Sequence, residues 1–269
     1  FDRSFLYGDG LFESLLVCKG KPFRWAQHIE RLERGAAFLK IKLPFPAESL
    51  RRFADDLIAR NQMPDGLLRL TLSRGVGVRG YSPKGADHPT LVMSLHPSSG
   101  APISGPAGSL NAQPRWKLIT ATFRLPANDA VAQFKTCNKL AQILARAEAD
   151  TAGADEALLL NTDGFVVEGA SSNLFWIEAE TVCTAPLISG ILAGVTRSVI
   201  LEICESLKIP NREADSTPAE LSRAQGVFVT LSSLGVVEAE SLDAARLATS
   251  PLIEKIRGAY GKLVSAETS

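Results

Sequence analysis

The apolar residues of this chain follow two different periods, and this alternation is the strongest constraint on its fold. Residues 68–73 alternate apolar and polar side chains, as a half-buried strand does. Residues 25–41 instead carry apolar side chains three and four positions apart, which predicts a helix, and a second helix is expected over 46–61. Further strands are expected over 11–17 and 90–95. The mixture predicts an α/β (α+β) fold.

The second half of the sequence repeats this mixture. Strands are predicted over residues 117–123, 157–160, 165–167, 174–177, 181–184 and 226–231, the second and third forming a hairpin. Helices are predicted from Lys135 to about Ala152, from Val195 to Leu207 and from Thr217, where Thr-Pro-Ala-Glu fits a capping box. In the first of these helices we expect four apolar side chains to face the core: Leu140, Ile143, Leu144 and Ala147.

Residues 97–109 separate the two halves. They include three prolines and three glycines and few side chains that a core could bury, which favours a linker. We therefore predict a smaller N-terminal α/β domain, residues 1–112, and a larger C-terminal domain, residues 113–269. A long surface loop within one domain is the alternative interpretation.

The composition argues against several functions. Lysine plus arginine equals aspartate plus glutamate at 29 each, so we expect neither a nucleic acid nor a membrane as partner. No apolar run reaches the roughly 18 residues of a membrane span. The four cysteines and three histidines have no metal-ligand spacing, so no metal is expected. Scattered cysteines of this kind indicate reduced thiols in a cytoplasmic protein.

Several short motifs carry groups suited to catalysis. Lys135 stands at the mouth of a predicted helix, and Glu168 ends an apolar strand before a turn of small residues. Residues 190–197 form a glycine-bearing loop that leads into a helix, where backbone N–H groups and the Thr196 hydroxyl suit a phosphate monoester. Hydroxyls of residues 230–233 follow a buried strand and suit the same phosphate. Taken singly, each motif also fits a surface lysine, an edge carboxylate or an ordinary helix cap.

Together and in this order, the motifs resemble the fold-type IV pyridoxal 5′-phosphate enzymes. These include branched-chain aminotransferases, D-amino acid aminotransferases and 4-amino-4-deoxychorismate lyases. The resemblance begins at residues 2–13 (DRSFLYGDGLFE), includes residues 28–32 (HIERL) and ends at Ser232 and Ser233. It implies a two-domain enzyme, with the cofactor in the cleft between the domains, and a homodimer in which the partner closes the site.

The resemblance also implies roles for individual residues. Lys135 corresponds to the lysine that bonds the cofactor aldehyde as an imine and then moves a proton at the substrate carbon. Glu168 corresponds to the partner of the pyridine nitrogen, and Leu192 to the apolar residue on the ring face. The groups implied for the phosphate are Arg31, the N–H groups of Val195 and Thr196, and a hydroxyl of Ser232 or Ser233.

The choice of substrate depends on residues 73–82 (SRGVGVRGYS), where a strand continues into a glycine-rich loop with two arginines. A mobile surface loop is the ordinary interpretation. The resemblance implies that Arg79 binds a substrate carboxylate bidentately, with Tyr81 beside it. This pattern resembles the lyases, whereas D-amino acid aminotransferases carry a histidine in place of Tyr81. Residues 135–140 also resemble the lyases, but residues 231–235 depart from all three groups.

The leading hypothesis is a lyase that converts 4-amino-4-deoxychorismate into 4-aminobenzoate and pyruvate for folate biosynthesis. The alternative is an aminotransferase of D-amino acids or branched-chain amino acids, which shares the cofactor and the proton transfer. A third hypothesis is a non-catalytic cofactor-binding protein, against which Lys135 and Glu168 argue. Arg124 and Lys139 are either further carboxylate contacts or surface charges.

Overall fold

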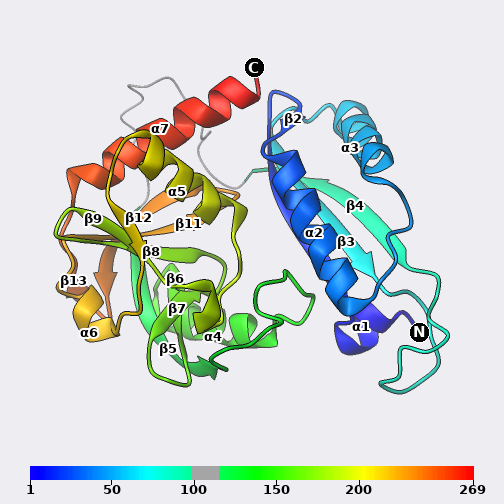
Figure 1. Ribbon diagram of the computed structural model, residues 1–269, viewed down its shortest axis with the longest axis horizontal. Helices are drawn as coiled ribbons and strands as arrows, with labels where there is room; N and C mark the ends of the chain where they lie inside the picture. The colour runs from blue at the N-terminus through cyan, green and yellow to red at the C-terminus, as the bar shows by residue number, and fades with distance from the viewer. Residues whose placement is uncertain (99–114) are drawn as a thin grey trace. The chain divides into compact units, whose positions relative to one another are not determined.

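The computed structural model describes residues 1–98 and 115–269 (Figure 1). Its described residues form two compact units. The first comprises residues 1–98 with Phe134–Lys139 and Val264–Ser269, and the second comprises residues 115–133 with Leu140–Leu263. The boundary predicted near residue 112, and residues 99–109 of the predicted linker, lie outside the described residues. The division into residues 1–112 and 113–269 therefore stays a prediction.

An antiparallel sheet in the order β2-β1-β3-β4 forms the centre of the first unit. Its strands are β1 (Gly10–Cys18), β2 (Lys21–Pro22), β3 (Gly66–Ser73) and β4 (Thr90–His96). β1 pairs with β3 along nearly its whole length, from Gly10 opposite Ser73 to Val17 opposite Gly66. The alternation predicted for β3 is confirmed, since Leu68, Leu70 and Leu72 are fully buried while Leu67, Arg69 and Thr71 are only half-buried. Each buried leucine contributes roughly 1.5–3 kcal/mol to stability.

Two amphipathic helices cover one face of this sheet. Helices α2 (Trp25–Leu39) and α3 (Ala47–Asn61) contribute Ile29, Leu32, Leu50 and Ile58 to one hydrophobic cluster with the inward side chains of β1 and β3. Both helices confirm the predicted ranges to within a few residues. A short helix, α1 (Arg3–Tyr7), precedes β1 and was not predicted; Asp2 caps it by accepting the N–H groups of Ser4 and Phe5.

The second unit is built on a closed barrel of six strands. Around the ring the order is β8-β11-β12-β5-β6-β7, and β7 pairs again with β8. The strands are β5 (Trp116–Leu125), β6 (Glu156–Asn161), β7 (Val166–Gly169), β8 (Asn173–Glu178), β11 (Gly226–Leu231) and β12 (Gly235–Leu242). β9 (Thr181–Thr184) and β10 (Asn211–Glu213) extend the sheet from β8, and β13 (Ala245–Arg246) pairs with β12. All six ring strands contribute to one buried apolar cluster, which therefore fills the barrel.

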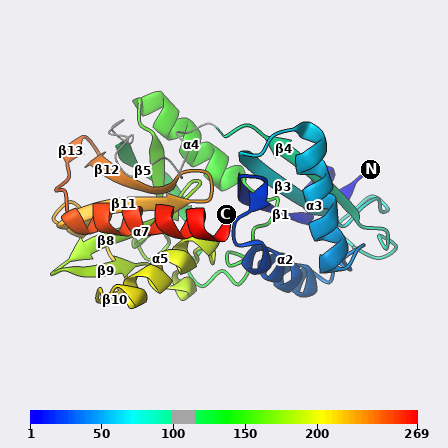
Figure 2. The ribbon, with the colours of Figure 1, turned by 90° about the horizontal axis from the view of Figure 1, so that it is seen from above.

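Helices pack on two sides of this barrel. α5 (Val195–Ser206) and α7 (Pro251–Glu267) lie side by side along one side, whereas α4 (Leu140–Ala152) packs on β5 and β6 (Figures 1 and 2). A 3₁₀ turn, Leu187–Ser189, precedes α5. The short helix α6 (Pro218–Leu221) begins with the capping box predicted at Thr217, which the structure confirms. No helix in the described ranges has both the length and the apolar character needed to cross a membrane.

The prediction for α4 was wrong in two respects. The helix begins at Leu140, because residues 134–139 are not helical and their backbone bonds to β1 through Phe12 N–H to Lys135 O (2.8 Å) and Cys137 N–H to Gly10 O (2.9 Å). The four side chains expected inside, Leu140, Ile143, Leu144 and Ala147, are exposed instead, the first two at 69% and 60%. Ala145 and Ala149 face the barrel, because small side chains allow the helix to approach β5 and β6 closely.

Candidate active site

Lys135, the central residue of the predicted site, lies in the non-helical segment of residues 134–139, which is hydrogen-bonded to β1. Its backbone carbonyl accepts the Phe12 N–H, and the neighbouring Thr136 forms a bridge with Leu11. Its ammonium nitrogen lies 4.7 Å from the centroid of the Phe12 ring, a distance typical of a cation–π contact. Backbone pairing and ring contact together position this half-buried amine.

A buried charged cluster lies in the same unit. Arg31 donates to both carboxylate oxygens of Glu13, from Nε at 2.8 Å and from Nη2 at 2.6 Å, and His28 Nδ1 lies 2.7 Å from Glu13 Oε2. Burial favours a higher pKa for Glu13, but Arg31 and His28 outweigh it and lower that pKa to about 2. Burial lowers the pKa of His28, and the hydrogen bond and charge of Glu13, which favour a higher pKa, do not outweigh it together with the positive charges of Arg31 and Lys135. Lys135 and Arg31 are therefore within electrostatic range of His28.

This cluster includes residues that the sequence analysis missed. Glu13 and His28 belong to the two quoted motifs, at residues 2–13 and 28–32, yet neither was assigned a role. Arg31 was predicted to bind phosphate, and the structure places its guanidinium in a bidentate pair with Glu13. Phosphate binding by Arg31 stays a prediction. The buried carboxylate of Glu13 fixes the orientation of the guanidinium that would make this contact.

Arg79 and Tyr81 lie in the loop that joins β3 to β4 (Figure 1). Both side chains are exposed, Tyr81 at 88%. Arg79 makes no hydrogen bond or ion pair to any residue that the structure describes. The Tyr81 ring packs edge-on against the Tyr7 ring with centroids 5.6 Å apart. The loop therefore presents an arginine that is not paired with a described residue next to a tyrosine held by an aromatic contact.

Glu168 lies near the end of β7 in the second unit and is only 8% exposed. Its Oε2 accepts the Leu192 N–H at 2.9 Å and the Asn173 Nδ2–H at 3.4 Å. Asn173 lies directly opposite Glu168 on β8 and also donates to the Leu192 carbonyl at 3.0 Å. The structure thus brings together two predicted residues, Glu168 and Leu192, and adds Asn173, which sequence reasoning missed.

A second buried carboxylate supports the turn that follows Glu168. Glu156 Oε2 accepts hydrogen bonds from the Ser171 N–H (3.1 Å), the Ser171 hydroxyl (2.6 Å) and the Ser172 hydroxyl (3.1 Å). Glu156 is fully buried. A signal for this residue exists in the sequence, because a lone glutamate opening the apolar strand Ala157–Leu160 needs buried partners.

The start of α5 offers backbone N–H groups without a side-chain cap. Gly194 is the N-cap residue and provides no side chain, and the next two residues, Val195 and Thr196, are buried. A Cβ atom at position 194 would lie 1.9 Å from Asn173 Oδ1, so only glycine fits there. A buried, uncapped helix start concentrates positive potential and suits an anion.

The strand β11 brings a hydroxyl to the same region of the barrel. Thr230 is 2% exposed and lies directly opposite Asn173 on β8. Its Oγ1 is buried and makes no hydrogen bond within the described part of the chain. The predicted Ser232 and Ser233 are half-buried and form the turn between β11 and β12. Glu168, Asn173 and Thr230 therefore occupy matching positions on three adjacent strands.

The predicted site residues divide between the two units. The first unit contains Arg31, Arg79, Tyr81 and Lys135, and the second contains Glu168, Leu192, Val195, Thr196, Ser232 and Ser233. Arg124 Nη1 donates to the Ala121 carbonyl at 2.6 Å, so a backbone group engages part of its guanidinium. The described residues include no group of three or more histidine, cysteine or acidic side chains arranged to hold a metal ion.

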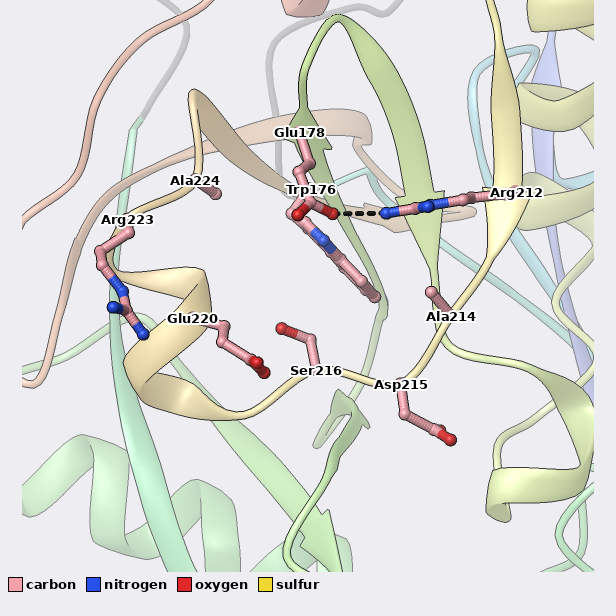
Figure 3. Close-up of a pocket in the computed structure, with 9 residues that line it drawn as sticks. All are labelled: Trp176, Glu178, Arg212, Ala214, Asp215, Ser216, Glu220, Arg223 and Ala224. Carbon is pink, nitrogen blue, oxygen red and sulfur yellow. Dashed lines mark hydrogen bonds and ion pairs between the residues drawn. The ribbon is translucent and has the colours of Figure 1, made fainter.

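A separate polar hollow of about 350 Å³ is lined by residues of β8, β10 and α6 and of the segments beside them (Figure 3). It shares no residue with the predicted site. Its charged lining residues are Glu178, Arg212, Asp215, Glu220 and Arg223. Arg212 is paired with Glu178 at 2.6 Å, and the other two carboxylates accept hydrogen bonds from Ser189 and Thr217. With three carboxylates and two arginines, this hollow is poorly suited to an anionic substrate.

Comparison with known proteins identifies the family. A family model described as amino-transferase class IV matches residues 10–242. A putative branched-chain-amino-acid aminotransferase of Methanocaldococcus jannaschii is 32% identical over 90% of this chain and 82% of that protein. An aminodeoxychorismate lyase of Vibrio harveyi is 34% identical over 90% of this chain and 86% of that protein.

A solved structure agrees with the sequence relatives. A T.th. branched-chain amino acid aminotransferase, complexed with N-(5′-phosphopyridoxyl)-L-glutamate, matches with a TM-score of 0.87 at 25% identity. The match covers 98% of this chain and 88% of that one. Because the family model spans most of the sequence and two relatives exceed 30% identity, the chain belongs to the amino-transferase class IV family.

Proposed function

We propose that this protein uses pyridoxal 5′-phosphate to convert 4-amino-4-deoxychorismate into 4-aminobenzoate and pyruvate, a step of folate biosynthesis. The observation that carries the choice of substrate is the pair Arg79 and Tyr81 in the loop after β3. Arg79 is an exposed cation whose planar guanidinium suits a carboxylate. The resemblance described above implies that Tyr81 stands where D-amino acid aminotransferases carry a histidine. The Vibrio harveyi lyase supports the same choice.

The second unit has features that fit a phosphorylated, nitrogen-containing ring. The start of α5 provides buried N–H groups without a side-chain cap, and Thr230 Oγ1 is a buried hydroxyl with no hydrogen-bond partner among the described residues. Amides and hydroxyls are the donors that a phosphate dianion needs. Glu168 is a buried carboxylate that Asn173 and the Leu192 N–H orient, which suits a protonated ring nitrogen.

Each predicted residue has a proposed place in this arrangement. Lys135 would hold the cofactor aldehyde, Glu168 the ring nitrogen, and Leu192 one face of the ring. The groups proposed for the phosphate are Arg31, Val195, Thr196, and the hydroxyls of Ser232 and Ser233, to which the structure adds Thr230 as a candidate. Arg79 and Tyr81 would bind the substrate carboxylate.

The chemistry that the bound cofactor supplies is an aldehyde that bonds amines and a cationic ring that withdraws electrons from the neighbouring carbon. Glu168 would balance the charge of that ring. The substrate amine would displace the amine of Lys135 from the cofactor. The freed Lys135 amine would then take the proton from the carbon of the substrate ring that bears the amino group. The bond between the substrate ring and the enolpyruvyl oxygen would then break, and the released enolpyruvate would take up a proton to become pyruvate. The ring that remains is aromatic, which drives the reaction. The two products contain all atoms of the substrate, so no second substrate is required.

The alternative is an aminotransferase of D-amino acids or branched-chain amino acids. The Methanocaldococcus jannaschii relative and the T.th. structure favour it. Lys135 and Glu168 would have the same tasks in both reactions, so the cofactor site does not separate them. The need for a 2-oxo acid does, because an aminotransferase must return the amino group to an acceptor.

The test is to supply the purified protein with 4-amino-4-deoxychorismate alone, and separately with D-alanine or leucine plus 2-oxoglutarate. Formation of 4-aminobenzoate and pyruvate without 2-oxoglutarate supports the lyase. Formation of glutamate supports the aminotransferase and contradicts the lyase proposal. Bound cofactor without turnover of any amine contradicts both and favours a binding protein. Bleaching of a yellow protein by borohydride checks the bond between Lys135 and the cofactor independently.

A homodimer in the cytoplasm is the proposed state of the protein. The outer face of α4 exposes Leu140, Ile143 and Leu144, which lie at helical spacing and suit a second copy of the chain. All four cysteines lack a disulfide partner within the described residues, which supports a reducing compartment. Molar mass by light scattering tests the first proposal, and localisation of a tagged protein tests the second.

A further inference from the structure

The guanidinium of Arg3 binds three consecutive carbonyls of one loop. We call residues 75–86 the carboxylate loop, because they carry Arg79 and Tyr81. Arg3 Nη1 donates to Gly80 O (2.9 Å) and Ser82 O (3.1 Å), and Nη2 donates to Tyr81 O (3.1 Å). Arg3 is 3% exposed. A buried side chain thus fixes the backbone on both sides of an exposed tyrosine.

The charge of Arg3 is balanced outside the loop. Arg3 Nε donates to Asp9 Oδ2 at 2.8 Å, and Arg74 Nε donates to the same oxygen at 2.7 Å. Burial favours a higher pKa for Asp9, but hydrogen bonds and charges of Arg74 and Arg3 hold that pKa below its ordinary value. Asp9 therefore stays charged at neutral pH and keeps the Arg3 guanidinium in one orientation. The remaining donors of Arg3 are then directed at the loop.

Tyr7 provides a second anchor from the same short helix. Its hydroxyl accepts the Gly80 N–H at 3.0 Å, its ring packs against Tyr81, and Arg3 Cζ lies 5.0 Å from its centroid. Gly80 has a φ of +118°, a conformation that favours glycine and fixes the direction of the chain between Arg79 and Tyr81. The anchors hold the backbone of the loop, while the Arg79 side chain stays exposed.

We propose that Arg3 is a positioning residue for substrate binding, with Tyr7 as its auxiliary, and that both act through Arg79. The proposal rests on the proposed function, because it takes Arg79 as the contact for the substrate carboxylate. Holding the loop before the substrate arrives removes the cost of ordering it on binding. Arg79 would otherwise sample many positions, and a bidentate contact tolerates only small displacements.

The first test measures the loop itself. In the holoenzyme, trypsin cleavage after Arg79 and Lys84 is followed by mass spectrometry for Arg3→Met, Arg3→Lys and Tyr7→Phe. Cleavage is expected to be about tenfold faster in Arg3→Met, with smaller increases in Arg3→Lys and Tyr7→Phe, because local opening exposes the loop. Arg74→Met is the matched control, since Arg74 shares Asp9 but donates to the carbonyls of Leu39 and Lys40.

The second test asks whether Arg3 acts through Arg79. KM for 4-amino-4-deoxychorismate is expected to rise about tenfold in Arg3→Met, with kcat changed less than about threefold. The increase in KM should be smaller in Arg3→Lys. In an Arg79→Gln background, adding Arg3→Met should leave KM unchanged, because the contact it positions is already lost.

Two outcomes overturn the anchoring role itself: unchanged loop cleavage in folded Arg3→Met, or KM effects of Arg3→Met and Arg79→Gln that multiply. An unchanged KM in Arg79→Gln would show that Arg79 does not bind the substrate carboxylate, and the proposal would then fail together with the proposed function. The cleavage data distinguish this failure, because they test whether Arg3 holds the loop without reference to the substrate. If Arg3→Met does not fold, the same criteria apply to Tyr7→Phe, which removes only the acceptor for the Gly80 N–H.

Discussion

Replacing Gly194 with alanine would place a methyl group where the Asn173 side chain now lies. The added Cβ would be 1.9 Å from Asn173 Oδ1, whereas ordinary contact begins near 3.4 Å. Asn173 is 6% exposed, so it cannot swing into solvent. The side chain must therefore move by about 1.5 Å, the difference between these two distances, or α5 must retreat.

Either movement disrupts hydrogen bonds of the proposed cofactor site. Asn173 Nδ2 donates to the Leu192 carbonyl at 3.0 Å and to Glu168 at 3.4 Å. Overpacking costs roughly 1–3 kcal/mol, and each lost hydrogen bond about 0.5–1.5 kcal/mol. We expect Gly194→Ala to lower the free energy of unfolding by about 2–4 kcal/mol and to weaken pyridoxal phosphate binding at least tenfold.

The matched control is Gly258→Ala. Gly258 lies inside α7, has open space around its ideal Cβ and has no positive φ. Alanine there should stabilise the protein by up to about 1 kcal/mol, since glycine is a poor helix former. Urea unfolding of both variants, with and without cofactor, and absorbance titration with pyridoxal phosphate measure the two effects. Gly194→Ala with wild-type stability and cofactor affinity would refute the reasoning.

Three further predictions concern the other parts of the molecule. The pKa of Glu13 is lowered from 4.5 to about 2, so its charged form contributes about 3 kcal/mol to the free energy of unfolding above pH 4.5, and this contribution is lost as the pH falls toward 2. Unfolding measured from pH 6 to pH 2 should show that loss, and the Glu13→Gln variant should be destabilised by about 3–5 kcal/mol at pH 7. Lys135→Ala should lower 4-aminobenzoate formation by at least about 10²-fold and prevent borohydride from fixing the cofactor to the protein; full turnover in this variant would contradict the proposed role. Leu140→Glu and Ile143→Glu should halve the molar mass measured by light scattering without altering the circular dichroism spectrum, whereas an unchanged mass would exclude α4 from the dimer interface.

The sequence predicted most elements of the fold because their signals are local. The alternation in β3 and the capping box at Thr217 depend on neighbouring residues alone, and both are confirmed. The orientation of α4 is not a local property. Its apolar stripe, which includes Leu140 and Ile143, predicts a buried face, but the alanines are the residues that the barrel covers. A stripe of apolar side chains does not reveal which partner covers it.

The candidate site shows the same limit. The motifs of Lys135 and Glu168 were visible in the sequence, whereas their surroundings depend on contacts that no spacing predicts. Glu13 pairs with a histidine 15 positions away and an arginine 18 positions away. Asn173 gains its importance from strand register, since it faces Glu168 on one side and Thr230 on the other. The non-helical course of residues 134–139 beside β1 likewise depends on long-range backbone pairing.

The closure of the barrel has a consequence for its dynamics. Five of the six junctions around the ring have three or more residue pairs in register, whereas β7 and β8 meet at the single pair of Glu168 and Asn173. This junction has the fewest residues in register, and one of the two, Asn173, donates to the other, Glu168, the carboxylate proposed for the ring nitrogen. Separation of β7 from β8 would therefore also remove Asn173 from the carboxylate of Glu168. Because a ligand stabilises the structure to which it binds, removal of the proposed cofactor should speed the exchange of amide hydrogens at this junction with solvent.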